Sequence, residues 1–327
     1  MTKISKRAWV EIGIGVGIFI VLALIAAFFD LAINKALFAP ESLFGQFFAN
    51  VGEFPSYLAA PAVGVIMFCQ RLGKSSRAQL IFKILFAALT AAGWYFFFSW
   101  VLGHLSNVDY LAAYCAVFAA IFTFLSLFIC YRVPIATMKK LFWFAVFLAI
   151  TAICVNVVIQ ILKAIWARER FRVMVGGYDR ALVPNGNYDG FTPWYLPQGF
   201  AKRGEDYMGA AEAVDALMGH HGDAFKSFPS GHTGAASVLM AIIILPDIMP
   251  KTLGRFKKLF WIVPFVYIAI MGLSRIVMGA HFLSDVLFGG YIGILVAVVV
   301  RFIMIKKVKA LNAEPEFRLV NEGYTVV

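Results

Sequence analysis

The chain has too few charged residues to cover the surface of a soluble protein of its length. Only 14% of its 327 residues are Asp, Glu, Lys or Arg, whereas 61% are hydrophobic and 16% are aromatic. Soluble domains are about 25% charged and about half apolar. The shortage of charge therefore excludes an ordinary soluble domain and predicts an integral membrane protein.

Acidic residues are scarcer than basic ones, 18 against 29, which gives a formal net charge of +11. A strongly basic chain can bind nucleic acid. Here most of the positive charge falls in short segments between apolar runs, where membrane topology and anionic lipid headgroups account for it. We therefore expect membrane lipids, and no nucleic acid, among the partners of this protein.

Cysteine is scarce as well, with four residues that lie in or at the ends of apolar runs: Cys69, Cys115, Cys130 and Cys154. A free cysteine in such a position behaves as a small buried hydrophobe. The spacing fits neither a disulfide framework nor a zinc site. The sequence predicts no metal site and no cofactor.

Long apolar runs make up most of the chain. A helix needs roughly 20 apolar residues to cross a bilayer, which predicts eight transmembrane helices near residues 9–29, 56–70, 80–103, 110–131, 141–163, 233–249, 259–278 and 284–304. The first run is too long for a cleaved signal peptide, so we expect an uncleaved anchor. The predicted fold class is an all-α polytopic membrane helical bundle.

The distribution of Lys and Arg predicts the orientation of these helices. Lys3, Lys6 and Arg7 precede the first run, which places the N-terminus in the cytoplasm by the positive-inside rule. With alternating spans, the other basic connections and the C-terminal tail also fall inside, and the short outer connections carry only Lys35. We expect a bacterial plasma membrane protein with both termini cytoplasmic.

We expect three regions: N-terminal transmembrane helices over 1–140, a core over 141–304 that holds the motifs below, and a cytoplasmic tail over 305–327. The core includes an extracytoplasmic loop, 171–228, whose aromatic and turn-forming residues favour an ordered cap. A short helix is expected there from Glu205 to about Met218. Residues 39–55 fit either an amphipathic interfacial helix or an ordinary connection.

The first motif is Lys163 and Arg170, seven residues apart. Both point to one face if the fifth helix extends past the bilayer, and two cations so placed can clamp a phosphate. The alternative is that they are snorkelling residues at a helix end. Arg168 and Arg172 would lie on other faces, as surface or headgroup contacts.

The second motif is Pro229-Ser230-Gly231-His232, directly before an apolar run. Ser230 is a natural N-cap, and Gly231 lets a ligand approach the backbone closely. A helix start binds anions, and His232 can reach the same anion. The alternative is a capped helix with an interfacial histidine.

The third motif combines Ser274 and Arg275 with His281 and Asp285. An arginine within a span is costly unless it faces the protein interior and finds a partner. His281 and Asp285 are four residues apart, so a carboxylate can fix the imidazole tautomer and leave the other ring nitrogen free to attack. A purely structural His–Asp pair is the alternative. All three motifs fall on the outer side.

The ordered signature Lys-x6-Arg, Pro-Ser-Gly-His and Ser-Arg-x5-His-x3-Asp resembles the type 2 phosphatidic acid phosphatase (PAP2) superfamily of membrane lipid phosphatases. The resemblance covers about residues 141–304. Two departures are visible: Phe171 follows Arg170 where the family usually has proline, and two helices are expected in addition to the six of the family core.

The resemblance implies a role for each motif residue. His281 would be the nucleophile that forms a phosphohistidine, oriented by Asp285, and His232 would be the general acid. The phosphoryl oxygens would be held without a metal by Lys163, Arg170, Ser230, Gly231 and Arg275.

The resulting functional hypothesis is a phosphatase that hydrolyses a lipid phosphate or diphosphate on the extracytoplasmic side. Candidate substrates are a polyprenyl diphosphate, phosphatidylglycerophosphate, phosphatidic acid and a glycolipid phosphate. Two other classes stay open: a phosphotransferase that passes the phosphoryl group to another acceptor, and a non-catalytic lipid-binding or transport protein.

Overall fold

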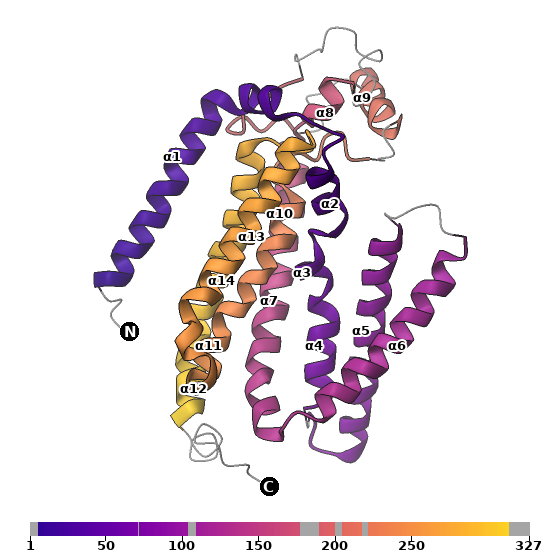
Figure 1. Ribbon diagram of the computed structural model, residues 1–327, viewed down its shortest axis with the longest axis vertical. Helices are drawn as coiled ribbons and strands as arrows, with labels where there is room; N and C mark the ends of the chain where they lie inside the picture. Colours follow the sequence, from indigo (N-terminus) through magenta and orange to yellow (C-terminus); the bar gives the residue numbers. More distant parts are fainter. Residues whose placement is uncertain are drawn as a thin grey trace. The chain divides into compact units, whose positions relative to one another are not determined.

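The computed structural model describes residues 6–70, 72–103, 109–176, 190–199, 205–217 and 222–313. These residues form helices joined by turns and short connections (Figure 1), and no strand occurs within them. The predicted all-α class is confirmed.

The longer helices are α1 (Lys6–Leu37), α5 (Ser76–Gly103), α6 (Leu111–Tyr131), α7 (Ile135–Trp166), α13 (Lys257–Val277) and α14 (Leu283–Ala313). The shorter ones are α2 (Leu43–Val51), α3 (Phe54–Tyr57), α4 (Ala59–Phe68), α8 (Phe171–Met174), α9 (Glu205–Leu217), α10 (Gly231–Ser237), α11 (Leu245–Ile248) and α12 (Pro250–Leu253). Two 3₁₀ segments, η2 (Val238–Ile244) and η3 (Gly254–Phe256), complete the described elements.

Eight segments of the described chain are long and apolar enough to cross a membrane, as the sequence predicts: Gly13–Leu37, Leu43–Phe68, Ser76–Gly103, Leu111–Tyr131, Ile135–Met174, Gly231–Ile248, Pro250–Val277 and Leu283–Ala310. The second begins well before its predicted start, and the fifth extends past both of its predicted ends. The second also shows what becomes of the connection before it. It includes α2, so part of the 39–55 segment is helical and joins the apolar stretch. The sixth is not one α-helix, because η2 follows α10 directly.

The chain divides into two compact units. The first comprises Met1–Ala49, Val158–Thr233 and Ile270–Tyr291, and the second comprises Asn50–Val157, Gly234–Ala269 and Ile292–Val327. Helices α7, α13 and α14 contribute residues to both units. All residues of the three sequence motifs belong to the first unit.

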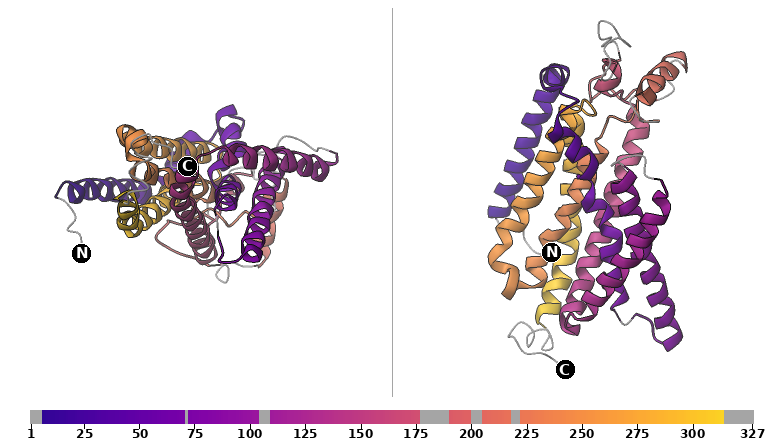
Figure 2. Two further views of the ribbon diagram at one scale, coloured as in Figure 1. Left: turned by 90° about the horizontal axis from the view of Figure 1, so that it is seen from below. Right: turned by 45° about the vertical axis from the view of Figure 1, so that its right-hand side comes forward.

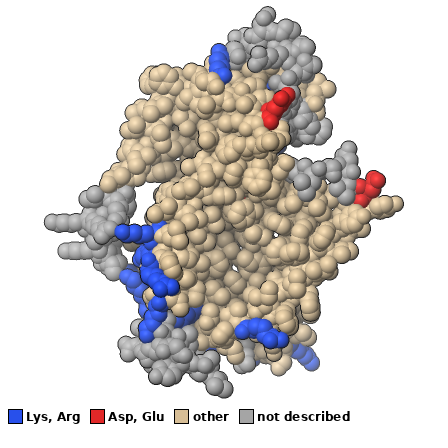
Figure 3. Space-filling model, in the orientation of Figure 1, with Lys and Arg blue, Asp and Glu red and all other residues tan. Residues whose placement is uncertain are grey.

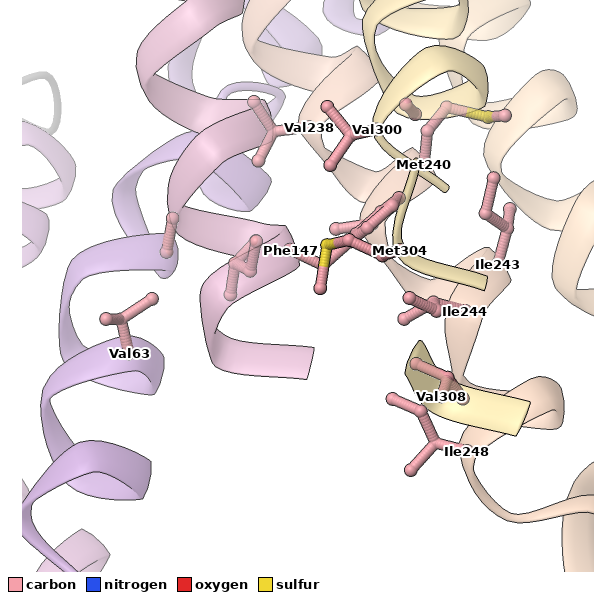
Figure 4. Close-up of a cluster of buried hydrophobic side chains, with 14 of the residues drawn as sticks. Val63, Phe147, Val238, Met240, Ile243, Ile244, Ile248, Val300, Met304 and Val308 are labelled. Atoms are coloured by element: carbon pink, nitrogen blue, oxygen red, sulfur yellow. The ribbon is translucent and has the colours of Figure 1, made fainter. Parts of the chain in front are cut away.

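The second unit has an apolar core in which Val63 of α4, Phe147 of α7, Val238 of η2 and Val300 of α14 pack together (Figure 4). Most residues of η2 are buried in this cluster. In the same unit α4, α5 and α6 run side by side (Figures 1 and 2). Much of α5 and α6 exposes large apolar side chains, which suits a lipid environment.

A cluster of ion pairs in the second unit joins α11, α13 and α14. Asp247 accepts hydrogen bonds from Lys257 Nζ (3.1 Å) and Arg301 Nε (2.8 Å). Most of the face shown in Figure 3 carries no charged side chain. Such a shortage of surface charge suits a lipid environment.

The first unit contains α1, α8, α9 and the ends of α7, α10, α13 and α14 that carry the motifs. On α1, Phe19 packs against Phe288 and Tyr291 of α14, with ring centroids 5.1 and 4.2 Å apart. Helix α9 confirms the short helix predicted from Glu205, and it lies beside α8 (Figure 1). The tail beyond 313 and, within the predicted cap, residues 177–189, 200–204 and 218–221 lie outside the described residues.

Close packing of α4 on α5 in the second unit depends on two glycines. A Cβ on Gly64 would stand 2.5 Å from Thr90 Oγ1 and 2.8 Å from the Thr90 nitrogen. A Cβ on Gly93 would stand 2.6 Å from the Pro61 nitrogen. Because backbone atoms cannot move aside cheaply, only glycine fits either position, and small residues are typical where membrane helices approach closely.

We therefore expect Gly93→Ala to destabilise the protein by about 1–3 kcal/mol through overpacking. The measurement is the melting temperature of the purified protein in detergent. Gly17→Ala on α1 is the matched control, because nothing lies within 4 Å of its Cβ position. Alanine otherwise favours a helix over glycine, so a Gly93→Ala protein as stable as Gly17→Ala would contradict this packing.

Candidate active site

Lys163 and Arg170 reach the site from two different elements. Helix α7 ends at Trp166, and Ala167 has a φ of 43°, in the left-handed region through which a helix does not continue. Arg170 then has an extended backbone, with φ −81° and ψ 143°. The expectation of one continuous helix that presents both cations on one face is therefore wrong.

Phe171 stands where the PAP2 pattern usually has proline, yet the backbone here has the conformation that a proline at this position would require. A residue before proline is restricted to extended conformations, and Arg170 has such a conformation. Phe171 is the first residue of α8, the helical position that proline tolerates best. Its ring is buried with Met174 and Phe282, so it contributes apolar packing at this position.

Both cations bind the segment that leads into the histidine motif. Lys163 Nζ donates a hydrogen bond to Lys226 O (2.9 Å). Arg170 Nε donates to Asp223 O (2.8 Å), and its Nη2 lies 3.4 Å from Asp223 Oδ2. Burial alone would raise the pKa of Asp223, but Arg170 and the other basic neighbours hold this pKa below its ordinary value. Asp223 is therefore an anion at neutral pH, and a bound phosphate would compete with it for Arg170.

Ser230, Gly231 and His232 begin the sixth span. The Thr233 N–H donates to Ser230 Oγ (3.3 Å), which confirms Ser230 as the N-cap of α10. Lys163 Nζ lies 3.5 Å from the place of a Cβ on Gly231, so the glycine keeps the space beside the ammonium group open. His232 is only partly buried. The first and second motifs thus meet.

Ser274 and Arg275 lie at the end of α13 and are both buried. The Ser274 hydroxyl donates to a carbonyl one turn back in its own helix (2.7 Å). The Arg275 carbonyl accepts from the N–H groups of Ala280 (3.1 Å) and His281 (3.3 Å). The Arg275 side chain interacts electrostatically with His232. The third motif therefore joins the other two.

His281 is completely buried, and its two ring nitrogens have different surroundings. Nδ1 lies 2.6 Å from Ser227 O and 3.8 Å from Asp285 Oδ2. A carbonyl can only accept, so Nδ1 carries the proton and Nε2 has a free lone pair. Nε2 is buried without a hydrogen-bond partner among the described residues. The ring centroids of His281 and His232 are 6.3 Å apart.

The surroundings of His281 keep its imidazole neutral. Burial, which would remove the hydration of a charged ring, and the Arg170 and Lys163 charges together lower the pKa of His281 to about 3. The neighbouring Asp285 carboxylate acts in the opposite direction without overcoming burial. The His281 ring is therefore neutral and unprotonated throughout the neutral pH range.

Asp285 is a fully buried carboxylate with every oxygen engaged. Its Oδ1 accepts from Arg168 Nη1 (2.6 Å), and its Oδ2 accepts from Ser227 Oγ (2.5 Å) and the Phe282 N–H (2.8 Å). The Ser227 carbonyl, and not Asp285, is within hydrogen-bond distance of His281 Nδ1. Asp285 therefore acts on the histidine mainly through its charge and through the residues that it holds in place.

Arg168 and Arg172 are not surface residues, which corrects the sequence interpretation. Arg168 is 1% exposed and bonds to Asp285, and Arg172 is 5% exposed and donates to Asp215 Oδ1 from Nη2 (2.9 Å). The reason is the break at Ala167. The sequence interpretation places both arginines on other faces of an extended fifth helix, but α7 ends before them.

Sequence reasoning also missed four polar residues of the same network: Asp30, Asn34, Ser227 and Ser284. Asp30 and Asn34 had a usable signal, because polar residues inside an apolar span are costly and mark functional positions. Ser227 had no such signal beyond its place before Pro229.

The described residues contain no group of three or more His, Cys, Asp or Glu side chains that could hold a metal ion. The charge suited to a phosphate comes from basic side chains. His281 and His232 both interact electrostatically with Arg170 and Lys163, and His232 does so with Arg275. Such an arrangement can bind an oxyanion next to a neutral imidazole.

Residues 140–309 match the family model described as the PAP2 superfamily. A stretch of 77 residues is 36% identical to "Phosphatidylglycerophosphatase B" of Bacillus subtilis (strain 168), and the alignment covers 23% of this chain and 37% of that protein. No solved structure matches this chain. Since the family match takes in more than half of the sequence and contains all three motifs, the chain belongs to the PAP2 superfamily.

Proposed function

We propose that this integral membrane protein is a lipid phosphatase that works through a phosphohistidine on His281. The observation that carries the proposal is the state of His281. Its Nδ1 faces a carbonyl at 2.6 Å, and its buried Nε2 has no hydrogen-bond partner in the described part of the chain. An unsatisfied buried nitrogen is unfavourable for stability. The unsatisfied nitrogen is explained if it is the nucleophile that attacks a phosphate held by the neighbouring cations.

In the first step Nε2 of His281 attacks the phosphorus, and the bond between phosphorus and the lipid oxygen breaks. His232 gives its proton to that leaving oxygen. Phosphoryl transfer depends on positioning and charge stabilisation more than on covalent chemistry by the protein. Lys163, Arg170 and Arg275 supply this charge.

The remaining oxygen contacts come from the start of α10. Ser230 and the N–H of Gly231 lie at a helix terminus where backbone donors favour anions. In the second step water attacks the phosphohistidine, and His232 takes the proton of that water. This step restores the neutral His281 ring and releases inorganic phosphate.

We infer that the substrate is a membrane lipid that carries a phosphate or diphosphate. Phosphatidylglycerophosphate is the first candidate, because the 77-residue match is to a protein named phosphatidylglycerophosphatase B. Polyprenyl diphosphate, phosphatidic acid and glycolipid phosphates complete the panel. The positive-inside rule favours cytoplasmic termini and an extracytoplasmic site.

The test is phosphate release by the purified protein from this panel in detergent. We expect release with at least one lipid, equal rates with and without EDTA, and inhibition by orthovanadate, which resembles the five-coordinate transferring phosphoryl group. Activity that EDTA abolishes and magnesium restores would contradict the assignment of the cations. Transfer of the phosphate to an acceptor other than water would identify a phosphotransferase instead.

The two histidines are expected to fail differently. His281→Ala removes the nucleophile, so no phosphoenzyme forms with any substrate. His232→Ala removes the general acid, which typically costs about 10²–10⁴-fold with a lipid leaving group and less with one that needs no proton. An activated aryl phosphate that enters the site should therefore partly rescue His232→Ala and leave His281→Ala inactive. Asp285→Asn should retain intermediate activity. Equal rescue of both histidine variants would contradict these roles.

The low pKa of His281 also predicts a pH dependence of stability. In the unfolded chain a histidine takes up a proton near pH 6.5, whereas in the folded protein His281 does so only near pH 3. Between these values the unfolded state binds more protons, so stability is fully present above pH 6.5 and is lost as the pH falls toward 3. One such group contributes a slope of up to about 1.4 kcal/mol per pH unit.

The measurement is the apparent melting temperature in detergent between pH 4 and pH 7.5. His281→Gln should flatten the decline on the acid side. Asn156→Ala, which removes a polar side chain on α7 that does not titrate, is the control and should keep the wild-type slope. Identical slopes for wild type and His281→Gln would show that the His281 ring is not buried in neutral form.

A further inference from the structure

Asp30 is a buried carboxylate on an otherwise apolar transmembrane helix. Its Oδ1 accepts from the Ser284 N–H (3.0 Å), and its Oδ2 accepts from the Ser284 hydroxyl (2.5 Å) and from Arg168 Nη2 (3.0 Å). Asp30 and Ser284 are 254 residues apart in sequence. Asp30 also lies well before residue 140, where the family match begins. It binds the start of α14, the helix that carries Asp285.

Arg168 connects Asp30 to Asp285. Its Nη1 donates to Asp285 Oδ1 (2.6 Å) and Ser284 Oγ (2.7 Å), and its Nε donates to Thr192 O (2.8 Å). Its Cζ lies 4.1 Å from the centroid of the Phe282 ring. Each of the three nitrogens therefore has a partner, so the guanidinium has a single well-defined position between the two carboxylates.

A second polar residue of α1 contacts the nucleophile segment directly. Asn34, one turn after Asp30, donates from Nδ2 to the carbonyl of His281 (3.1 Å). Leu31 and Phe38 pack against buried Phe282, which follows His281. Residues on one face of α1, together with Phe38 just after it, therefore hold in place both the backbone of His281 and Ser284, the residue before Asp285.

We propose that Asp30 is a positioning residue for the His281–Asp285 pair and acts on it through Arg168 and Ser284. The inference rests on the proposed phosphohistidine mechanism and extends it to α1. Asp30 and Ser284 fix the position of Arg168, which in turn holds the negative charge of the Asp285 carboxylate beside His281. Phosphorylation of Nε2 while Nδ1 keeps its proton gives the ring cationic character, which this charge stabilises. A buried ion pair is seldom the most stable choice for a fold, and a role in catalysis explains why one stands here.

The test is a double-mutant cycle of Asp30→Asn and Asp285→Asn, with kcat and KM measured on the best lipid substrate. We expect Asp30→Asn alone to lower kcat by about 10–100-fold, as for residues that support a site through another, with KM within about twofold. In the Asp285→Asn background the same change should lower kcat less than about threefold. A purely structural role would give additive effects in kcat, and additivity would overturn the proposal.

Asp247→Asn is the matched control, because Asp247 is also a largely buried carboxylate paired with an arginine, Arg301 (2.6 Å). It should leave kcat unchanged. If Asp30→Asn does not fold, Ser284→Ala replaces it, since this variant removes the hydroxyl between Asp30 and Arg168 without leaving an unpaired charge. We expect Ser284→Ala to lower kcat at least threefold, and an unchanged kcat would overturn the proposal.

A second measurement does not depend on lipid hydrolysis. In protein labelled with ¹⁵N-histidine, the Nδ1–H signal of His281 is assigned as the one absent from His281→Ala. Asp30→Asn or Ser284→Ala should shift this signal, and Asp247→Asn should not. If wild type hydrolyses none of the lipids, the proposed function fails, yet a shifted signal still supports the positioning role. An unmoved signal overturns it, whatever the activity.

Discussion

The guanidinium of Arg168 is the interaction on which the rest of the first unit depends. A buried arginine is tolerable only when its charge is paired and its donors are satisfied. Here Asp30 and Asp285 supply the pairing, and Thr192 and Ser284 take the remaining hydrogen bonds. Because these partners come from α1, from the segment before α9 and from the start of α14, the single side chain fixes three distant parts of the sequence around His281.

The basic residues of this unit divide into two groups with different tasks. Arg168 and Arg172 are paired with buried carboxylates and hold the surrounding elements in place. Lys163 and Arg170 instead bind backbone carbonyls of the 223–226 segment and the more exposed Asp223. A carboxylate at the edge of the site can be displaced by a phosphate at little cost, whereas the carboxylates beside Arg168 cannot. Under the proposed mechanism, Lys163 and Arg170 stay available for the phosphate while Arg168 and Arg172 keep their carboxylate partners.

The eight spans and the α9 helix follow from properties that single segments carry, namely apolar length and local turn residues, so the sequence was sufficient to predict them. The N-cap role of Ser230 is local in the same sense. The positions of Arg168 and Arg172, in contrast, depend on contacts with residues that are distant in the sequence. The sequence predicts a surface position for Arg168 because no residue pattern around Ala167 indicates the left-handed conformation that ends α7 there. The partner of Arg168, Asp30, lies 138 residues away, and a pairing at that distance has no signature in one sequence.

The pairing of Arg168 with Asp30 shows that residues outside the family match also support the site. The match begins at residue 140 and contains every motif residue, yet the carboxylate that shares Arg168 with Asp285 lies on α1. The family match takes in the motif residues, to which the proposed mechanism assigns the contacts with the phosphate. A supporting charge has more freedom, since any element that brings a carboxylate to the same guanidinium serves equally well. An N-terminal helix outside the family pattern can therefore be part of the machinery that holds the histidine.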